Sequence, residues 1–313
     1  MEKFSTMPSN GQKTECNIKV ENFSTLNIFR TMKKISLSFI ASNNTMATRT
    51  KIITIFNQKG GTGKSFITLN LAGCLAFKGY KTLVIDLDGQ ADVSSRLGHY
   101  RSEINILQVF REGREIPMLG VPFSDFLFLA PGSVHIRTTD REMWCNGNAH
   151  GVLKNAIAPI ADQFDFIIID TPPDHESVMV DNALFASTHL LVPIGGHGPN
   201  DIENLDTVMD KFITSQFKPG GGDIEFLGVI RNSVDDGAMA KLIHQQTEHF
   251  FEVSQGSNSA VFKTALRFLK EFKNAQAVPI PIVFQSLSKP ASKNFMEFTD
   301  ELLIRLKLKS IKA

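Results

Sequence analysis

The chain has 313 residues, of which 42% are hydrophobic and 21% are charged. These proportions are typical of a folded protein with a buried core, and they exclude a wholly disordered chain, a collagen-like fibre and a coiled-coil rod. Lys and Arg number 33 against 32 Asp and Glu, so an anion-binding surface has to be a local cluster of charge. The three cysteines include no CxxC pair, and no apolar run reaches the roughly 18–20 residues that span a bilayer, which favours a cytoplasmic protein.

Residues 1–45 differ from the rest of the chain. They are rich in Ser, Asn and Thr and show no sustained period of 2 or 3.6. We interpret them as a flexible N-terminal extension, with Met46 as an alternative start of the natural protein. The predicted organisation is therefore an extension over 1–45 and a single domain over 46–313.

From Lys51 onward, apolar runs of strand length alternate with amphipathic segments of helix length. The expected strands are Ile52–Phe56, Thr82–Leu87, Phe126–Ala130, Phe164–Ile169, His189–Ile194 and Ile224–Ile230. The expected helices are Lys64–Phe77, Gly151–Ala161, Val178–Phe185, Asp201–Phe217 and Ala238–Phe251. Continuous apolar strands are typical of parallel sheets buried on both faces. The pattern predicts an α/β fold with a doubly wound, mostly parallel sheet and helices on both faces.

The strongest motif, KGGTGKS at residues 59–65, directly follows the first strand and begins a helix. Its glycines allow several backbone N–H groups to surround one phosphate, and the helix N-terminus adds a positive dipole. Lys64 is expected to reach the β- and γ-phosphates, and Ser65 to bind Mg²⁺. Gln58 occupies the position of the first glycine of the usual GxxxxGK[ST] pattern. The residues expected to bind nucleotide here are Lys59, Gly60, Gly61, Thr62, Gly63, Lys64, Ser65 and Phe66.

Three motifs together resemble the ParA/MinD family of deviant Walker A ATPases. They are KGGTGKS with its additional Lys59, the strand segment LVIDLDGQ at residues 83–90, and FIIIDTPP at residues 166–173. The resemblance spans about residues 50–305 and is closest to ParA/Soj-type partition ATPases that lack an N-terminal helix-turn-helix domain.

The resemblance implies an ATP-dependent sandwich dimer that uses ATP and Mg²⁺. Lys59 is then expected to reach the phosphates bound by the partner, and Asp88 to orient the attacking water. Asp86 and Asp170, with Ser65, are expected to hold Mg²⁺ through its waters. Thr171 to Pro173 is expected to act as a switch, and Asn232 is a candidate adenine contact.

The resemblance also implies positioning of a plasmid, chromosome or protein cargo on nonspecific DNA, with hydrolysis stimulated by a ParB-like or other adaptor protein and weak without it. Two basic clusters could bind DNA phosphates and place the protein on the nucleoid; the alternative is that they are solvated helix faces. They comprise Lys263, Arg267, Lys270 and Lys273, and, further on, Lys289, Lys293, Arg305, Lys307, Lys309 and Lys312.

Two alternatives stay open from the sequence. The tail over residues 302–312 has a basic and an apolar side, which allows a MinD-like membrane surface role. Gly89 replaces the family's usual proline and Phe66 replaces a small residue, which allows a nucleotide-dependent scaffold that hydrolyses little.

Overall fold

The computed structural model describes residues 50–146, 150–195, 200–218, 222–235, 237–255, 260–267 and 280–308. The chain divides into two units, Met1–Asn44 and Thr45–Ala313, and all described residues belong to the second. The predicted extension over 1–45 lies outside the described residues, so the predicted domain organisation stays a prediction.

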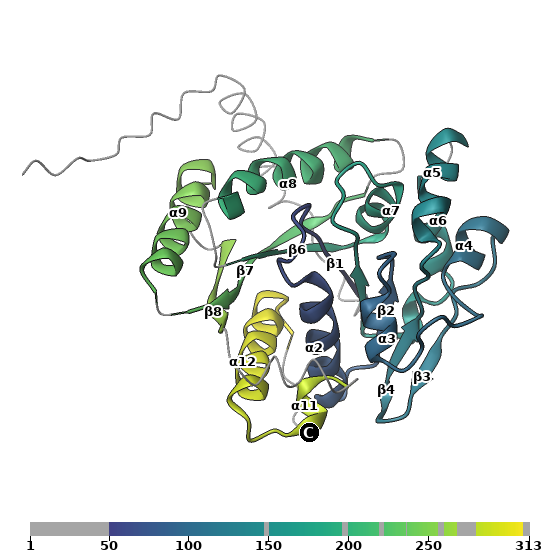
Figure 1. Cartoon of the computed structure of the whole chain (residues 1–313), viewed down its shortest axis with the longest axis horizontal. Helices are drawn as coiled ribbons and strands as arrows, with labels where there is room; N and C mark the ends of the chain where they lie inside the picture. Colours follow the sequence, from purple (N-terminus) through teal and green to yellow (C-terminus); the bar gives the residue numbers. More distant parts are fainter. Residues whose placement is uncertain are drawn as a thin grey trace, which may run out of the picture. The chain divides into compact units, whose positions relative to one another are not determined.

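One sheet of eight strands lies at the centre of the second unit, in the order β3-β4-β2-β5-β1-β6-β7-β8 (Figure 1). The strands are β1 (Lys51–Ile55), β2 (Thr82–Asp86), β3 (Leu119–Val121), β4 (Ser124–Ala130), β5 (Phe166–Asp170), β6 (His189–Ile194), β7 (Glu225–Val234) and β8 (Val261–Arg267). Every neighbouring pair is parallel except β3 with β4. The predicted doubly wound, mostly parallel sheet is confirmed.

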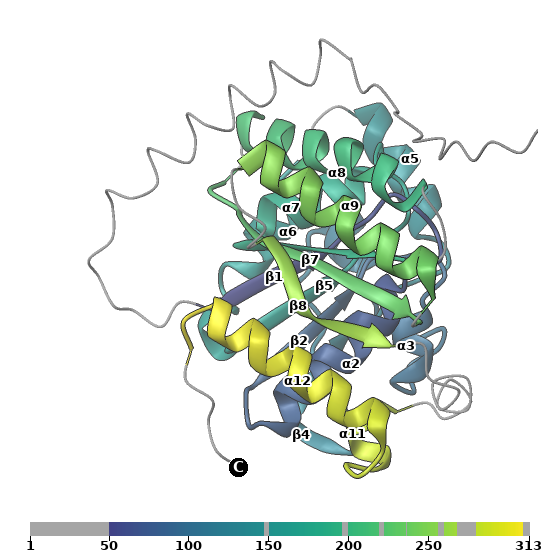
Figure 2. The same cartoon turned by 90° about the vertical axis from the view of Figure 1, so that its left-hand side faces the viewer.

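Helices cover both faces of this sheet, as Figures 1 and 2 show. One face carries α2 (Lys64–Phe77), α3 (Asp92–Arg96), α11 (Ile282–Gln285) and α12 (Pro290–Arg305). The other carries α4 (Leu107–Glu112), α5 (Ile136–Asn146), α6 (Val152–Ile157), α7 (Val178–Ala186), α8 (Asn200–Phe217) and α9 (Ala238–Gln255). Because both faces are covered, β2, β5 and β6 are buried along their whole length.

The predicted elements recur with small shifts of their ends. The helix Lys64–Phe77 and the strand His189–Ile194 have the predicted bounds. The prediction missed the short strand β3 and the edge strand β8. The alternative that the first basic cluster lies on a solvated helix face is wrong for residues 261–267, which form strand β8. Phe262 and Leu266 are four residues apart, as on one face of a helix, yet they are buried residues of a strand.

Helix α2 holds the phosphate loop against the rest of the unit, because it is buried on nearly all sides. Gly73 lets α11 approach, since a Cβ there would lie 2.4 Å from the Cβ of Pro281. Asn70 accepts a hydrogen bond from the backbone N–H of Ile282 (2.8 Å). The ring of Phe66 meets Phe295 of α12 edge-on, with 5.4 Å between centroids. Helix α2 is thus held by α12 at its first turn and by α11 further along.

The edge strand β8 is held by side chains of α12 as well as by β7. The Glu301 carboxylate accepts hydrogen bonds from the backbone N–H of Lys263 and of the following residue, both at 2.8 Å. Asn294 accepts from the N–H of Arg267 and donates to the carbonyl of Ala265, both at 3.0 Å. These bonds satisfy backbone groups that an edge strand otherwise leaves unpaired.

Candidate functional site

The phosphate loop, residues 57–65, joins the end of β1 to the first turn of α2. Asn57 fixes the start of the loop, since its side chain donates to the carbonyl of Pro193 (2.8 Å) and accepts from the N–H of Lys59 (2.9 Å). Gly61 has a φ of +78° and Gly63 a φ of +89°, a backbone region that favours glycine. A Cβ at Gly61 would meet nothing within 4 Å, so this side of the loop is open.

Asn232 of β7 contacts the phosphate loop from the other side. Its amide Nδ2 donates to the carbonyl of Thr62 at 2.9 Å. A Cβ on Gly63 would lie 2.0 Å from that nitrogen, so the close approach requires glycine here. The side chain of Asn232 therefore supports the loop, and its predicted contact with adenine stays a prediction.

Lys64 lies beneath the loop with only 6% of its surface exposed. Its Nζ donates to the carbonyl of Lys59 at 3.2 Å. Burial lowers the pKa of Lys64, while the nearby carboxylates of Asp170 and Asp88 act to raise it. A bound phosphate would add negative charge beside the ammonium and stabilise its charged form, which is what the predicted role of Lys64 requires.

Asp170, at the end of β5, is the best-placed carboxylate for a magnesium ion. Its Oδ1 accepts a hydrogen bond from Thr68 (3.0 Å), whereas its buried Oδ2 has no hydrogen-bond partner. Burial, and then the charge of Asp86, raise the pKa of Asp170 well above its ordinary value, and a hydrogen bond from Ser65 acts against them. A cation between Ser65 and Asp170 would supply a partner for the unpaired Oδ2.

The donor set fits Mg²⁺ only with help from a nucleotide. Within the described ranges, no group of three or more His, Cys, Asp or Glu side chains is arranged to hold a metal ion. Mg²⁺ usually keeps several waters and binds one or two protein groups together with phosphate oxygens. Ser65 and Asp170 match that pattern, so they are the residues that would hold the ion beside bound ATP.

Asp86 is also buried, but its oxygens are already hydrogen-bonded. One oxygen accepts from the backbone N–H (3.0 Å) and the hydroxyl (2.6 Å) of Ser94, and the other from the N–H of Asp88 (3.1 Å). Burial raises the pKa of Asp86 to about 6 despite these bonds. Ser94, which the sequence analysis did not identify, therefore gives Asp86 a structural role. Its predicted contact with magnesium waters stays a prediction.

Asp88 lies in the loop after β2, where the resemblance places the residue that orients water. Burial raises its pKa, whereas the charges of Lys64 and Arg137 lower it. Arg137 comes from α5 and lies across Gly89, because a Cβ on that glycine would be 3.1 Å from Cγ of Arg137 and 3.0 Å from Cγ2 of Ile136. Arg137 was not predicted from the sequence, and its approach, with that of Ile136, explains the glycine at position 89.

The remaining predicted residues have contacts of their own. Phe66 uses its ring to pack against α12, so only its backbone is left for the predicted nucleotide contact. Thr171 is buried, and its hydroxyl donates to the carbonyl of Ile55 (2.8 Å), which ties the predicted switch segment to β1. Lys59 is half-buried at the loop. Its reach into a partner molecule stays a prediction.

Four of the predicted DNA-binding residues are exposed on two neighbouring elements. Lys263 and Arg267 are exposed on β8, and Lys289 and Lys293 are exposed at the start of α12, which packs on β8. Lys270 and Lys273 lie outside the described residues. Arg305 does not belong to the basic surface, because its guanidinium lies 3.8 Å from the ring centroid of Phe262 and pairs with Glu301 (3.0 Å).

The end of α12 is used for packing. Leu302, Leu303 and Leu306 are buried in the core, whereas Ile304 is exposed and residues 309–312 lie outside the described residues. The MinD-like membrane role of this tail stays a prediction. Across the described parts of the chain, no helix is long and apolar enough to cross a membrane.

A family model described as an AAA domain matches residues 50–214, just over half of the chain. The chain is 27% identical to the chromosome partitioning protein ParA of Myxococcus xanthus over 264 residues, which cover 83% of this chain and 90% of that protein. It is 25% identical to the sporulation initiation inhibitor protein Soj of Bacillus subtilis over 260 residues, covering 80% and 98%.

Solved structures with the same fold include apo McdA from Cyanothece, with a TM-score of 0.70, 21% identity, and coverage of 81% of this chain and 99% of that one. Cobyrinic acid a,c-diamide synthase from Mycobacterium smegmatis, with a bound ATP analogue and magnesium, has a TM-score of 0.68 at 19% identity, covering 84% and 99%. A plasmid partition protein from Borrelia burgdorferi has a TM-score of 0.60 at 22% identity, covering 83% and 99%. At these identities the likeness concerns the fold.

Proposed function

Because this chain belongs to the AAA domain family and is a P-loop ATPase of the ParA/MinD type, we propose that it is a partition or positioning ATPase that binds nonspecific DNA in its ATP state. The observation that carries the proposal is the arrangement around the phosphate loop. Buried Lys64 lies there beside Asp88 and Asp170, and the loop is open at Gly60 and Gly61.

ATP is proposed to bring two copies together across this open side of the loop. Lys59 precedes the glycines and is half-buried at the rim. In a dimer it would add positive charge where the transition state of phosphoryl transfer gathers negative charge. Asp88 would orient the water, and Ser65 with Asp170 would hold the magnesium ion whose charge stabilises the phosphates.

DNA is the surface that we propose for the ATP state. The exposed lysines and arginines of β8 and α12 come from neighbouring elements, and a dimer would present two such sets. Contacts with phosphates alone give affinity without sequence preference. A ParB-like or other adaptor protein would then stimulate hydrolysis, which is weak on its own, and release the protein from the nucleoid.

The test is retention of unrelated DNA by the full chain without nucleotide and with ADP, ATP or a slowly hydrolysed ATP analogue, each at two salt concentrations. Light scattering in the same four states reports the mass. We expect a dimer and salt-sensitive retention only with ATP or the analogue. Retention that ignores the nucleotide, or is absent in every state, would contradict the proposal.

A matched pair of variants locates the DNA surface. Lys289→Glu with Lys293→Glu should abolish retention while leaving ATP affinity unchanged. Arg111→Glu with Arg114→Glu makes the same change of charge on and beside α4, where both arginines form exposed ion pairs, and should retain DNA like the natural protein. If both double variants lose DNA retention equally, the loss reflects the net charge of the protein and not this surface.

A scaffold that binds ATP and hydrolyses little is the second candidate, favoured by Gly89 and by Arg137 across it. Phosphate release distinguishes the two functions. Release that never rises above background, with DNA and a cell extract containing the adaptor, would favour the scaffold.

A further inference from the structure

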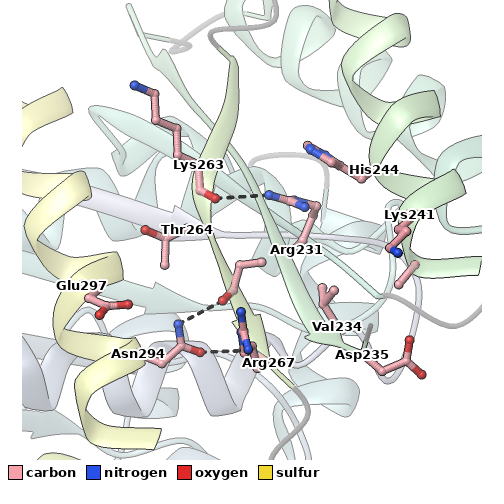
Figure 3. Close-up of a pocket in the computed structure, with 12 residues that line it drawn as sticks. Arg231, Val234, Asp235, Lys241, His244, Lys263, Thr264, Arg267, Asn294 and Glu297 are labelled. Carbon is pink, nitrogen blue, oxygen red and sulfur yellow. Dashed lines mark hydrogen bonds between the residues drawn. The ribbon is translucent and has the colours of Figure 1, made fainter. Parts of the chain in front are cut away.

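A second pocket, of about 530 Å³, opens at the β8 edge of the sheet between α9 and α12 (Figure 3). Its size falls in the range of about 300–1,000 Å³ that is usual for small-ligand sites. None of the described residues that line it belongs to the phosphate loop. They are Arg231, Val234, Asp235, Ala240, Lys241, His244, Lys263, Thr264, Ala265, Arg267, Asn294 and Glu297.

An irregular pairing of β7 with β8 gives this edge its shape. Val229 pairs with Val261, but Arg231 pairs with Ala265, so two additional residues of β8 are accommodated in between. Such bulges re-aim side chains and interrupt the backbone hydrogen bonds of the ladder. Here the side chain of Arg231 supplies hydrogen bonds in place of the interrupted ones: its Nη2 donates to the carbonyls of Phe262 (3.4 Å) and the next residue (3.2 Å).

Arg231 therefore carries a positive charge that is oriented but not neutralised by a direct partner. Its guanidinium donates to neutral carbonyls, and its buried Nε has no hydrogen-bond partner. Among the described residues, no carboxylate forms a direct ion pair with it, although the charges of Glu248 and Glu301 act on it from further away. A buried guanidinium nitrogen without an acceptor costs free energy, and a ligand oxygen would supply that acceptor.

His244 of α9 presents a second buried nitrogen without a partner. Its Nδ1 has no hydrogen-bond partner, while its Nε2 lies 3.4 Å from a carboxylate oxygen of Glu248 one turn along the helix. Figure 3 shows the imidazole on the same side of the pocket as the Arg231 guanidinium. Two unsatisfied nitrogens from two different elements thus line one cavity.

Charge at the rim selects an anion. Lys241, Lys263 and Arg267 are exposed there with Arg231 below them, and the carboxylates of Asp235 and Glu297 also line the pocket. Two further carboxylates act on this region from outside the lining: Glu248, which faces His244, and Glu301, which is paired with Arg305. The cations come from three elements and surround the cavity. A phosphate group matches this arrangement better than a carboxylate does, because it carries close to two charges and three acceptor oxygens.

We infer that this pocket is a second anion site, which binds a phosphate ester or polyphosphate of about mononucleotide size independently of the ATP in the phosphate loop. Arg231 would donate to the phosphate oxygens, His244 would donate from Nδ1 in its doubly protonated form, which the negative charge of the phosphate stabilises, and Lys241, Lys263 and Arg267 would close the rim. The inference does not rest on the proposed role in partition.

Calorimetric titration with inorganic pyrophosphate tests the site, using the full chain with its phosphate loop saturated by a non-hydrolysable ATP analogue and Mg²⁺. We expect one pyrophosphate to bind per chain. Arg231→Gln should weaken that binding by about tenfold or more, because a charged hydrogen bond is lost. Absence of binding to the natural protein, or unchanged binding to this variant, would overturn the inference.

Two further variants control for folding and for general charge. Lys241→Gln leaves the bonds between Arg231 and β8 intact and should still weaken binding several-fold. Lys289→Gln with Lys293→Gln removes charge from α12 outside the pocket and should bind pyrophosphate normally. Equal binding by Lys241→Gln and the natural protein, or weakening by the α12 pair alone, would contradict the assignment.

Competition with short double-stranded DNA identifies the source of the phosphate. If DNA does not displace pyrophosphate, the site takes a free ligand, as inferred. If DNA displaces it from the natural protein and the displaced amount falls in Arg231→Gln, the same pocket receives a phosphate of the DNA backbone. Retention of DNA with no change in pyrophosphate binding would separate this site from the DNA surface.

Discussion

The middle of the sheet and its β8 edge differ in how regular the backbone pairing is and in how the polar side chains are paired. In the middle, β5 pairs with β1 and with β2 in unbroken parallel register, yet a buried oxygen of Asp170 at the strand end has no partner. At the edge, the register of β7 with β8 shifts twice, yet Glu301 and Asn294 satisfy the backbone of β8. Regular backbone with an unsatisfied carboxylate oxygen marks the phosphate-loop site. At the edge, side chains of α12 stabilise an irregular backbone next to the unsatisfied nitrogens of the inferred anion site.

The difference teaches where substitutions should act. A substitution beside the phosphate loop should change nucleotide binding or turnover. It should leave the free energy of unfolding nearly unchanged, or even raise it. Replacing a residue that forms hydrogen bonds with β8 should lower the free energy of unfolding and leave nucleotide binding and turnover unchanged.

Lys59→Ala should reduce stimulated turnover by about a thousandfold, because a charge that acts on the transition state is lost. The backbone carbonyl of Lys59, which accepts from Lys64, remains in the variant. ATP affinity should therefore be preserved, whereas Lys64→Ala should abolish it. Steady-state phosphate release and titration with a fluorescent ATP analogue measure the two effects. Normal turnover in Lys59→Ala would remove the predicted contact across the dimer.

Glu301→Ala should lower the free energy of unfolding by about 3 kcal/mol, because two backbone N–H groups and the guanidinium of Arg305 lose their acceptor. Burial acts to raise the pKa of Glu301, but the hydrogen bonds from Thr264, Lys263 and Arg305 lower it overall. Its stabilisation is thus present above the ordinary pKa of a glutamate and is lost as the pH falls through the lowered value.

Urea denaturation from pH 3 to pH 7 measures this contribution. The natural protein and Glu301→Ala should differ most at pH 7 and converge at the acid end. Glu297→Ala, on the same helix but exposed, is the matched control and should be close to neutral. A large loss of ATP affinity in Glu301→Ala would show that the edge and the phosphate loop are not separate.

The same contrast explains what the sequence allowed us to predict. The middle strands are continuous apolar runs, and the phosphate loop is a local motif, so fold, loop and α2 followed from neighbouring residues. Strand β8 did not, because its partners are Glu301 and Asn294, more than twenty residues further along the chain. Phe262 and Leu266 also imitate the spacing of a helix.

Within the site, the residues missed are those that act on a motif from elsewhere. Ser94 and Arg137 contribute a hydroxyl and a charge to Asp86 and Asp88 only after the chain folds. A serine and an arginine in polar segments carry no sequence signal of that role. Gly89 was noticed as a departure, but the reason for it is the approach of α5, which a single sequence does not contain.

Asp170→Asn should stabilise the nucleotide-free protein by about 2 kcal/mol at neutral pH, because it removes an unpaired buried charge. The folded-state pKa of Asp170 is raised, so the natural protein loses stability as the pH rises through that value. The gain in the variant should therefore be absent below about pH 4, the ordinary range of an aspartate, and grow above it.

Thermal unfolding of both proteins from pH 4 to pH 8 tests whether the variant gains stability over the natural protein as the pH rises. His189, whose pKa burial lowers to about 4, is present in both proteins, but Asp86 interacts electrostatically with Asp170, so the difference between the curves reports this pair of carboxylates. Addition of ATP and Mg²⁺ should reverse the order, because the variant has lost a group that holds the ion. A variant that is less stable without nucleotide at pH 7 would place Asp170 among structural residues.

Arg137→Gln tests the smallest effect, which is on Asp88. The charge of Arg137 acts to lower the pKa of Asp88 against the effect of burial, so its removal should shift the acid limb of the turnover profile to higher pH. At neutral pH we expect a loss of only a few-fold. Arg137 is exposed, so the variant should unfold like the natural protein. Arg137→Lys should restore the acid limb, since it keeps the charge; a profile that the charge does not move would leave Arg137 as a packing residue over Gly89.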